Sequence, residues 1–182
     1  MKNKLEIRIA GSGGQGVILC TIILAEASLY DWEYVAQAQA YGPEARGGAC
    51  KAELVVSDHL RDYPKVDYSD FLMCLSQKAV AKYGDKIKDG STVVLDSSLD
   101  ASMFDGMDCR LIKIPVLRSA EELGNPMCAN IIAAGITNAC LKLSDEESLE
   151  KAVVKYVPGG SRDLNIKAVQ YGAKLYNDAD KE

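Results

Sequence analysis

The segment LEIRIAGSGGQGVILCTIILAEASL, residues 5–29, decides the fold. Residues 5–10 alternate between apolar and polar side chains, which is typical of a β-strand with one buried face. A six-residue run containing four glycines follows, and residues 17–29 are then apolar nearly all round, as in a helix buried against a sheet. The segment therefore predicts a strand, a tight glycine loop and a helix, which form the first unit of an α/β fold.

Strand patterns recur along the first two thirds of the chain, bounded by turn residues and interrupted by one short helix over residues 78–83. The further strands are predicted over residues 34–40, 49–57, 71–76, 92–96 and 110–116. Because strands that alternate with helices favour parallel pairing, we expect a mostly parallel sheet flanked by helices.

The last third of the chain is predicted to be helical. Asn125 and Pro126 are expected to begin one helix as its N-cap and first residue, a Ser144 capping box begins a second that stops before Pro158, and residues 163–176 form the last. Small residues in the first of these helices favour close approach of another element; they are Ala129, Ala133, Ala134, Gly135 and Ala139. Residues 1–182 are thus expected to form a single Rossmann-like α/β domain with a helical C-terminal part.

Composition narrows the class of protein. The 182 residues carry a formal net charge of -5, and 48% of them are hydrophobic, which is typical of one globular domain and not of a disordered or fibrous chain. No cluster of cations indicates nucleic-acid binding. The mostly apolar stretches are shorter than the ~20 residues that a membrane helix needs, and we expect a cytoplasmic protein.

The cysteines and the single histidine indicate little independent chemistry. The six cysteines include no C-x-x-C pair, so we expect reduced, mostly buried thiols and no metal site on this chain; they are Cys20, Cys50, Cys74, Cys109, Cys128 and Cys140. His59 follows a strand and is expected to be a surface turn residue. We therefore predict no catalytic residue on this chain.

The glycine loop fits the G-x-G-x-x-G pattern between a strand and a helix, where backbone N–H groups and the helix dipole can bind an anion. Binding of a dinucleotide also needs an acidic residue at the tip of the second strand, and residues 39–42 contain none. Two alternatives to a dinucleotide site remain open. The glycines can serve close packing alone, or the loop can bind another phosphate-bearing or partner group.

The segment YGPEARGG, residues 41–48, is the second unusual stretch. It can be a turn in which Arg46 pairs with Glu44 in solvent. Alternatively, an arginine flanked by glycines can reach a phosphate, a carboxylate or a partner chain. The residues alone leave both interpretations open.

Taken together, GSGGQGV at residues 11–17 and YGPEARGG at residues 41–48 resemble the gamma subunit of 2-oxoacid:ferredoxin oxidoreductases. The resemblance continues through residues 51–58, 114–115 and 122–125 to Asn130, and so covers nearly the whole chain. The YGPEARGGA loop is most similar to the 2-oxoglutarate form, while branched-chain, pyruvate and indolepyruvate forms remain alternatives. A stand-alone Rossmann-type nucleotide-binding protein, supported by the glycine loop only, is the alternative from another class.

The resemblance implies a subunit of an enzyme that oxidatively decarboxylates a 2-oxoacid to an acyl-coenzyme A and passes electrons to ferredoxin. It implies alpha, beta and ferredoxin-like delta subunits as partners, with thiamine diphosphate, Mg²⁺, [4Fe-4S] clusters and coenzyme A used by the complex. None of these cofactors is assigned with certainty to this chain, which is expected to shape the complex and its coenzyme A side. The candidate cofactor-binding residues are Gly11, Ser12, Gly13, Gly14, Gln15, Gly16, Tyr41, Glu44, Arg46, Asn125 and Asn130.

Asn125 and Asn130 also have simpler interpretations. Asn125 can be a helix cap, and Asn130 can make a buried polar contact. A scaffold that touches no ligand therefore stays open for this part of the chain.

Overall fold

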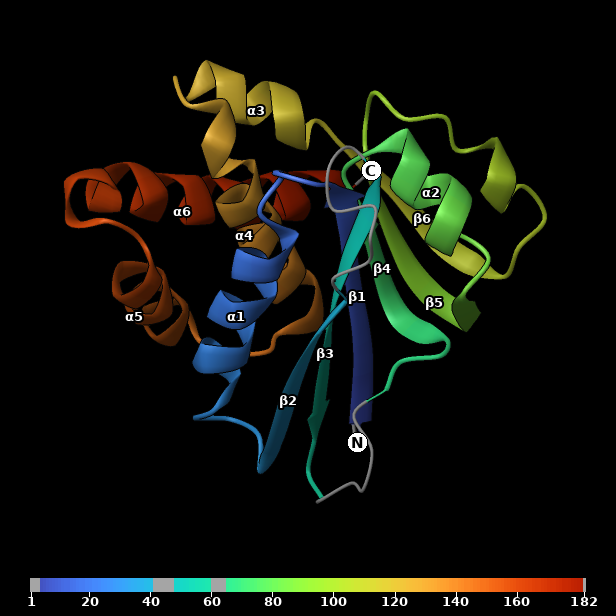
Figure 1. Cartoon of the computed structure of the whole chain (residues 1–182), viewed down its shortest axis with the longest axis horizontal. Coiled ribbons are helices and arrows are strands. Elements are labelled where there is room, and N and C mark those ends of the chain that lie inside the picture. Colours follow the sequence, from blue (N-terminus) through green and yellow to red (C-terminus); the bar gives the residue numbers. More distant parts are fainter. Residues whose placement is uncertain (1–3, 41–47, 60–64, 182) are drawn as a thin grey trace.

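A computed structural model describes residues 4–40, 48–59 and 65–181, in which a six-stranded sheet is flanked by six α-helices (Figure 1). The strands are β1 (Lys4–Ser12), β2 (Tyr34–Ala40), β3 (Ala49–Ser57), β4 (Ser69–Cys74), β5 (Ile87–Asp96) and β6 (Cys109–Ile114). The helices are α1 (Val17–Ser28), α2 (Gln77–Tyr83), α3 (Val116–Glu122), α4 (Ala129–Leu141), α5 (Glu146–Tyr156) and α6 (Arg162–Ala179). Short 3₁₀ turns are η1 (Ser102–Phe104), η2 (Pro126–Cys128) and η3 (Gly159–Ser161).

The strands lie in the order β2-β3-β1-β4-β5-β6. The pairs β1–β4, β4–β5 and β5–β6 are parallel, whereas β3 runs antiparallel to both β1 and β2. The mostly parallel α/β sheet is therefore confirmed. The sheet differs from the dinucleotide-binding arrangement in one respect, because the antiparallel β3 separates β2 from β1.

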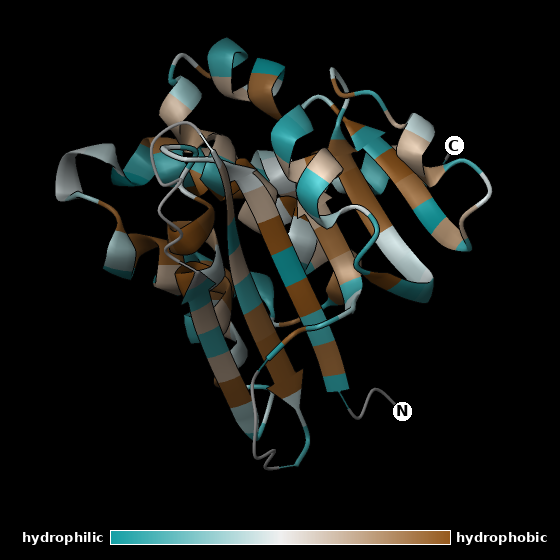
Figure 2. Ribbon diagram, turned by 45° about the vertical axis from the view of Figure 1, so that its right-hand side comes forward, coloured by the Kyte–Doolittle hydropathy of each residue, from teal (hydrophilic) through white to brown (hydrophobic). Residues whose placement is uncertain are grey.

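Helices cover the two faces of the sheet unequally (Figure 1). Ile7 and Ile9 of β1 point into the larger core, which packs against α1, α4, α5 and α6. Leu72 and Cys74 of β4 point to the other face, where α2 covers a smaller core. The alternation of hydrophobic and hydrophilic residues along β1 is visible in Figure 2 and has the period-2 pattern of side chains on a strand.

The end of the sixth strand differs from the prediction. We expected a strand to residue 116, but β6 ends at Ile114, and Val116 begins α3, a helix that the sequence pattern did not indicate. Asp96, at the end of β5, holds this helix start because its Oδ2 accepts a 2.8 Å hydrogen bond from the Leu117 N–H. The stabilising group lies 21 residues away in sequence, so the local pattern of residues 110–116 could not reveal it.

Two other boundaries are corrected. β5 begins at Ile87 and not at residue 92, because its partly exposed first half still pairs with a neighbouring strand. α5 begins one residue later than the predicted capping box, with Asp145 as N-cap: its Oδ1 accepts a 2.7 Å hydrogen bond from the Ser148 N–H. Ser144 instead donates from its N–H to the Asn138 side chain at 3.0 Å, which joins the end of α4 to the start of α5.

Among the helices that the structure describes, none combines the length and the apolar character needed to cross a membrane.

Candidate functional site

The glycine loop, residues 11–16, lies at the carboxyl end of β1 and leads into α1 (Figure 1). Gly14 and Gly16 have left-handed backbone angles, with φ 95° and φ 71°. Gly14 is exposed, and a Cβ there would meet nothing within 4 Å, so only its backbone conformation requires glycine. Gly16 is the N-cap residue of α1 and brings no side chain to the helix terminus. The loop therefore presents backbone groups at the start of the helix.

The antiparallel pairing of β1 with β3 brings Gly48, the last residue of the second unusual segment, to the glycine loop. Gly11 lies opposite Cys50, and Ser12 lies opposite Ala49. Beyond the strands, the Gly13 N–H donates a 3.3 Å hydrogen bond to the Gly48 carbonyl, and Gly48 is the last residue of the second segment. The predicted site residues Tyr41, Glu44 and Arg46 lie outside the described residues. Their segment nevertheless ends beside the glycine loop.

Gln15 uses its carboxamide within the protein. Its Oε1 accepts a 2.6 Å hydrogen bond from the Ser12 N–H, and its Nε2 donates at 3.0 Å to the Leu75 carbonyl, just beyond β4. The sequence could not reveal the Leu75 contact, because the group involved is a main-chain carbonyl 60 residues away.

The structure places the two predicted asparagines differently. Asn130, 5% exposed near the start of α4, donates from Nδ2 to the Gly16 carbonyl at 3.3 Å and so contacts the glycine loop. The Asn125 Oδ1 accepts a 3.0 Å hydrogen bond from the Met127 N–H, as the N-cap of η2. Of the simpler interpretations, the cap at Asn125 and the buried polar contact of Asn130 are both confirmed.

A set of main-chain donors remains at the loop. Among the described residues, the N–H groups of Gly14 and Gly16 have no hydrogen-bond acceptor, whereas those of Ser12, Gly13 and Gln15 do. The first turn of α1 has no side-chain cap and no acidic residue. Orphan N–H groups and the positive end of a helix dipole together can bind an anion such as a phosphate.

In the described part of the chain, no titratable side chain at the loop has a pKa shifted so as to make it reactive at neutral pH. Burial raises the pKa of the Cys20 thiol in α1 and of the Cys128 thiol, which keeps both protonated at neutral pH. His59 is exposed in a bend just after β3, as predicted. Because Ser57 pairs with Lys4, that bend lies at the opposite end of β1 from the glycine loop.

Arg8 is a structural residue that the sequence patterns did not single out. It is 1% exposed, and its guanidinium donates to Glu53 at 2.8 Å and to the carbonyls of Val66 and Lys86 at 2.5 and 2.9 Å. Register explains the pair, because Arg8 lies directly opposite Glu53 on β3. These carboxylate and carbonyl partners compensate the buried charge and tie β1 to β3 and to the residues that precede β4 and β5.

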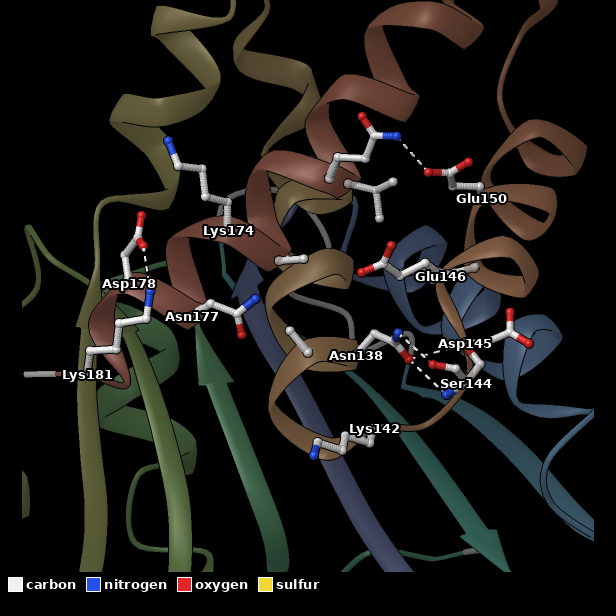
Figure 3. A pocket seen from close by; sticks show the side chains of 15 residues that line it. Asn138, Lys142, Ser144, Asp145, Glu146, Glu150, Lys174, Asn177, Asp178 and Lys181 are labelled. Carbon is white, nitrogen blue, oxygen red and sulfur yellow. Dashed lines mark hydrogen bonds and ion pairs between the residues drawn. The ribbon is translucent and has the colours of Figure 1, made fainter.

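A separate pocket of about 810 Å³ lies between α4, α5 and α6 (Figure 3). It is at the C-terminal end of α4, whereas Asn130 meets the glycine loop at the N-terminal end. Some of its polar side chains pair with one another: the Ser144 hydroxyl donates to Asn138 Oδ1 at 3.2 Å, and Gln170 Nε2 donates to Glu150 at 2.7 Å. None of the predicted site residues that the structure describes lines this pocket.

Comparison with known proteins identifies relatives over the whole length. The sequence profile of the family described as pyruvate ferredoxin/flavodoxin oxidoreductase matches residues 6–175. The 2-oxoglutarate synthase subunit KorC of Methanocaldococcus jannaschii is 44% identical over 178 residues, which cover 96% of this chain and 95% of that protein. The ketoisovalerate oxidoreductase subunit VorA of Methanothermobacter thermautotrophicus is 32% identical over 94% of this chain and 36% of VorA. Pyruvate synthase subunit PorC of the same organism is 30% identical over 91% of this chain and 92% of PorC.

Solved structures of related proteins have the same fold as this chain. The gamma subunit of a keto/oxoacid ferredoxin oxidoreductase from Geobacter sulfurreducens has a TM-score of 0.86 and 36% identity, over 97% of this chain and 98% of that chain. The 2-oxoglutarate:ferredoxin oxidoreductase from Magnetococcus marinus, with 2-oxoglutarate, coenzyme A and succinyl-CoA bound, has a TM-score of 0.87 at 22% identity. The match covers 98% of this chain and 32% of the Magnetococcus chain, and at this identity it shows a shared fold.

These relatives confirm the predicted resemblance to the gamma subunits of 2-oxoacid:ferredoxin oxidoreductases. Identity is higher with the 2-oxoglutarate form, which the YGPEARGGA loop placed first, than with the ketoisovalerate and pyruvate forms. The chain belongs to the pyruvate ferredoxin/flavodoxin oxidoreductase family.

Proposed function

We propose that this chain is the gamma subunit of a 2-oxoglutarate:ferredoxin oxidoreductase, which converts 2-oxoglutarate and coenzyme A to succinyl-CoA and CO₂ and reduces ferredoxin. The observation that carries the proposal is the 44% identity to a 2-oxoglutarate synthase subunit of nearly the same length. The chain acts as one part of an oxidoreductase and not as an enzyme by itself.

Within the complex, the glycine loop contributes to the coenzyme A side. The support is chemical: the N–H groups of Gly14 and Gly16, which have no acceptor among the residues that the structure describes, and the start of α1 suit a pyrophosphate. Arg46 lies two residues before Gly48, whose carbonyl bonds to the loop, and its guanidinium can add a charge-assisted hydrogen bond to the same anion. The Magnetococcus relative, which shares the fold, was solved with coenzyme A bound.

The remaining cofactors belong to other subunits in this proposal. Thiamine diphosphate with Mg²⁺ and the [4Fe-4S] clusters are assigned to alpha, beta and ferredoxin-like delta subunits. An iron–sulfur cluster needs grouped thiolates, whereas the six cysteines of this chain are scattered over six different elements. The described residues also include no group of three His, Cys, Asp or Glu side chains that could hold a metal ion.

We place the complex in the cytoplasm as part of the same proposal. Its support is that the six cysteines, all of them among the described residues, form no disulfide, which is the usual state of thiols in a reducing compartment.

The test uses the assembled complex, purified by co-expression of this chain with the other subunits. Calorimetric titration with coenzyme A compares the parent protein with Arg46→Ala and with Arg162→Ala, a control that removes an exposed arginine at the start of α6. We expect Arg46→Ala to weaken coenzyme A binding about tenfold, since a hydrogen bond to a charged group contributes about 1.5 kcal/mol or more. Arg162→Ala is expected to leave the affinity unchanged. Equal affinities for all three proteins would refute the coenzyme A assignment, and failure to assemble with the other subunits would refute the subunit assignment.

A further inference from the structure

The parallel pairing of β1 with β4 stops abruptly next to the glycine loop. Paired residues run from Ile7 opposite Phe71 to Ala10 opposite Cys74. The Leu75 N–H then donates a 2.9 Å hydrogen bond to the Ala10 carbonyl. In a continued parallel ladder, the next hydrogen bond would run from the Ser12 N–H to the Leu75 carbonyl.

The carboxamide of Gln15 occupies the place of that missing hydrogen bond. The Ser12 N–H donates to Gln15 Oε1 at 2.6 Å, and Gln15 Nε2 donates to the Leu75 carbonyl at 3.0 Å. One partner is a donor and the other an acceptor, so the orientation of the amide is determined by its neighbours. With the amide inserted, Ser12 stays paired with β3 and the end of β1 separates from β4.

The separation occurs where the connections of two neighbouring parallel strands leave on opposite faces. After β1 the chain enters α1, which packs in the larger core, and after β4 it enters α2, which packs in the smaller core (Figure 1). In open α/β sheets, ligands bind in the crevice outside the strand ends at such a switch point. The amide of Gln15, bonded to Ser12 and Leu75, thus lies at this switch point.

We propose that Gln15 is a positioning residue for the anionic ligand of the glycine loop. Its side chain holds the ends of β1 and β4 apart and keeps the N–H groups of Gly14 and Gly16 placed for the ligand, without touching the ligand itself. The proposal rests on the proposed function, which supplies coenzyme A as that ligand.

The neighbouring sequence agrees with this role. A Cβ on Gly11 would lie 2.5 Å from Gln15 Oε1, so the glycine makes room for the amide. Glutamate in place of Gln15 would keep an acceptor for Ser12 but would lose the donor to Leu75 at neutral pH. Both polar side-chain atoms of Gln15 already have hydrogen-bond partners within the protein. The backbone of Gly14, by contrast, is exposed to solvent.

The experiment compares Gln15→Met with the parent in the assembled complex. Methionine is similar in length and lacks both hydrogen bonds. Gln170→Met, which alters an exposed glutamine of α6 bonded to Glu150, is the matched control. The readouts are hydrogen exchange of the peptide spanning residues 5–17 without ligand, and KM for coenzyme A and kcat in the oxidation of 2-oxoglutarate.

We expect Gln15→Met to accelerate exchange in that peptide and to raise KM for coenzyme A about tenfold, or about 1.4 kcal/mol, with kcat nearly unchanged. A purely structural role predicts faster exchange with an unchanged KM, and direct ligand contact predicts a raised KM with unchanged exchange. Either result overturns the proposal.

Two further comparisons keep the outcome decisive. If Arg46→Ala weakens coenzyme A binding and Gln15→Met does not, only the positioning role fails; if neither does, the coenzyme A assignment fails as well. Should Gln15→Met not assemble, Gln15→Glu is measured in the same way, because it removes only the donor to Leu75. An unchanged KM for Gln15→Glu would then count against the positioning role.

Discussion

Gly16 has no room for a side chain. Its φ is 71°, and a Cβ would lie 2.5 Å from Nδ2 of Asn130. We expect Gly16→Ala to lower the free energy of unfolding by about 2 kcal/mol, with about 1 kcal/mol from the left-handed backbone and the rest from displacing the Asn130 amide. Urea unfolding of the isolated chain measures the loss.

Gly90→Ala is the matched control, because Gly90 has φ 73° and a Cβ there meets nothing within 4 Å. It should cost only the backbone contribution, about 1 kcal/mol. Equal losses for the two variants would show that the Asn130 amide moves aside without cost.

At the scale of residues, the sequence identified the glycine loop but not the roles within it. The G-x-G-x-x-G pattern predicted a tight glycine loop between a strand and a helix, and the left-handed angles of Gly14 and Gly16 agree with such a turn. That Gln15 bonds to Leu75 depends on where β4 lies in the sheet. Side-chain partners distant in sequence are set by packing, so no local pattern contains them.

Two helices cross at glycines. A Cβ on Gly135 of α4 would lie 2.1 Å from the Val169 carbonyl oxygen, and one on Gly172 of α6 would lie 2.2 Å from the Ile132 carbonyl oxygen. The small side chains within residues 129–139 predicted that another element packs closely against this helix. That prediction is confirmed, and the element is α6. Because each obstacle is backbone, neither helix can yield without moving as a whole.

We expect Gly172→Ala to destabilise the chain by about 2 kcal/mol. The sign is informative, since glycine to alanine in a helix interior ordinarily stabilises by about 1 kcal/mol. Thermal and urea unfolding check it, with Gly159→Ala as control, where a Cβ meets nothing within 4 Å. A stabilised Gly172→Ala variant would mean that the two helices separate easily.

An ion-pair cluster joins the first residues of β1, β4 and β5. Lys88 lies 2.6 Å from Glu6 and 2.9 Å from Asp70, and Lys4 lies 2.6 Å from Glu6. Burial raises the pKa of Glu6, but the hydrogen bonds and charges of Lys4 and Lys88 outweigh it, and the net pKa lies below the ordinary 4.5. Burial lowers the pKa of Lys88, and its two carboxylate partners outweigh that effect, so the net pKa lies above 10.5.

The two pKa shifts determine how the stability of the chain changes with pH. A lowered pKa at Glu6 means that its stabilisation is present above pH 4.5 and is lost as the pH falls through the folded-state pKa. The raised pKa of Lys88 means stabilisation that is present below pH 10.5 and is lost as the pH rises through the folded-state value. We expect Glu6→Gln to lose less stability than the parent between about pH 5 and pH 3.

Urea unfolding across that range measures the difference between the parent and Glu6→Gln. Glu147→Gln, which alters a surface carboxylate paired with Lys151 within α5, is the control and should keep the acid dependence of the parent. If Glu6→Gln loses as much stability as the parent when the pH falls over that range, then Glu6 does not contribute to the acid dependence of folding stability.

At the scale of elements, local periodicity predicted most strands and helices. The strands over residues 34–40 and 49–57 have the predicted bounds, because alternation and turn residues mark them within the segment itself. The helix α3 was missed because its cap, Asp96, comes from another strand. Elements stabilised by their own residues are readable from sequence, and those stabilised from a distance are not.

At the scale of the whole molecule, the order of the strands decides what the glycine loop can bind. A dinucleotide site requires the end of the second strand to lie beside the glycine loop. Here β3 lies between β1 and β2, so the end of β2 is not beside the loop. The same antiparallel strand places Gly48 against Gly13 and thereby brings the second segment to the loop. The strand order therefore differs from that of a dinucleotide site.

The sequence by itself determined the α/β class, the glycine loop, most elements and the family resemblance, because each rests on residues close together in the chain. Only the tertiary structure decided the strand order, the meeting of the two segments, the crossing of α4 with α6 and the bridge made by Gln15. These features depend on contacts between distant residues, which form only when the sheet and its helices pack. The physical reason is that the propensity to form a helix or strand depends on residues close together in the chain, whereas packing depends on residues far apart in it.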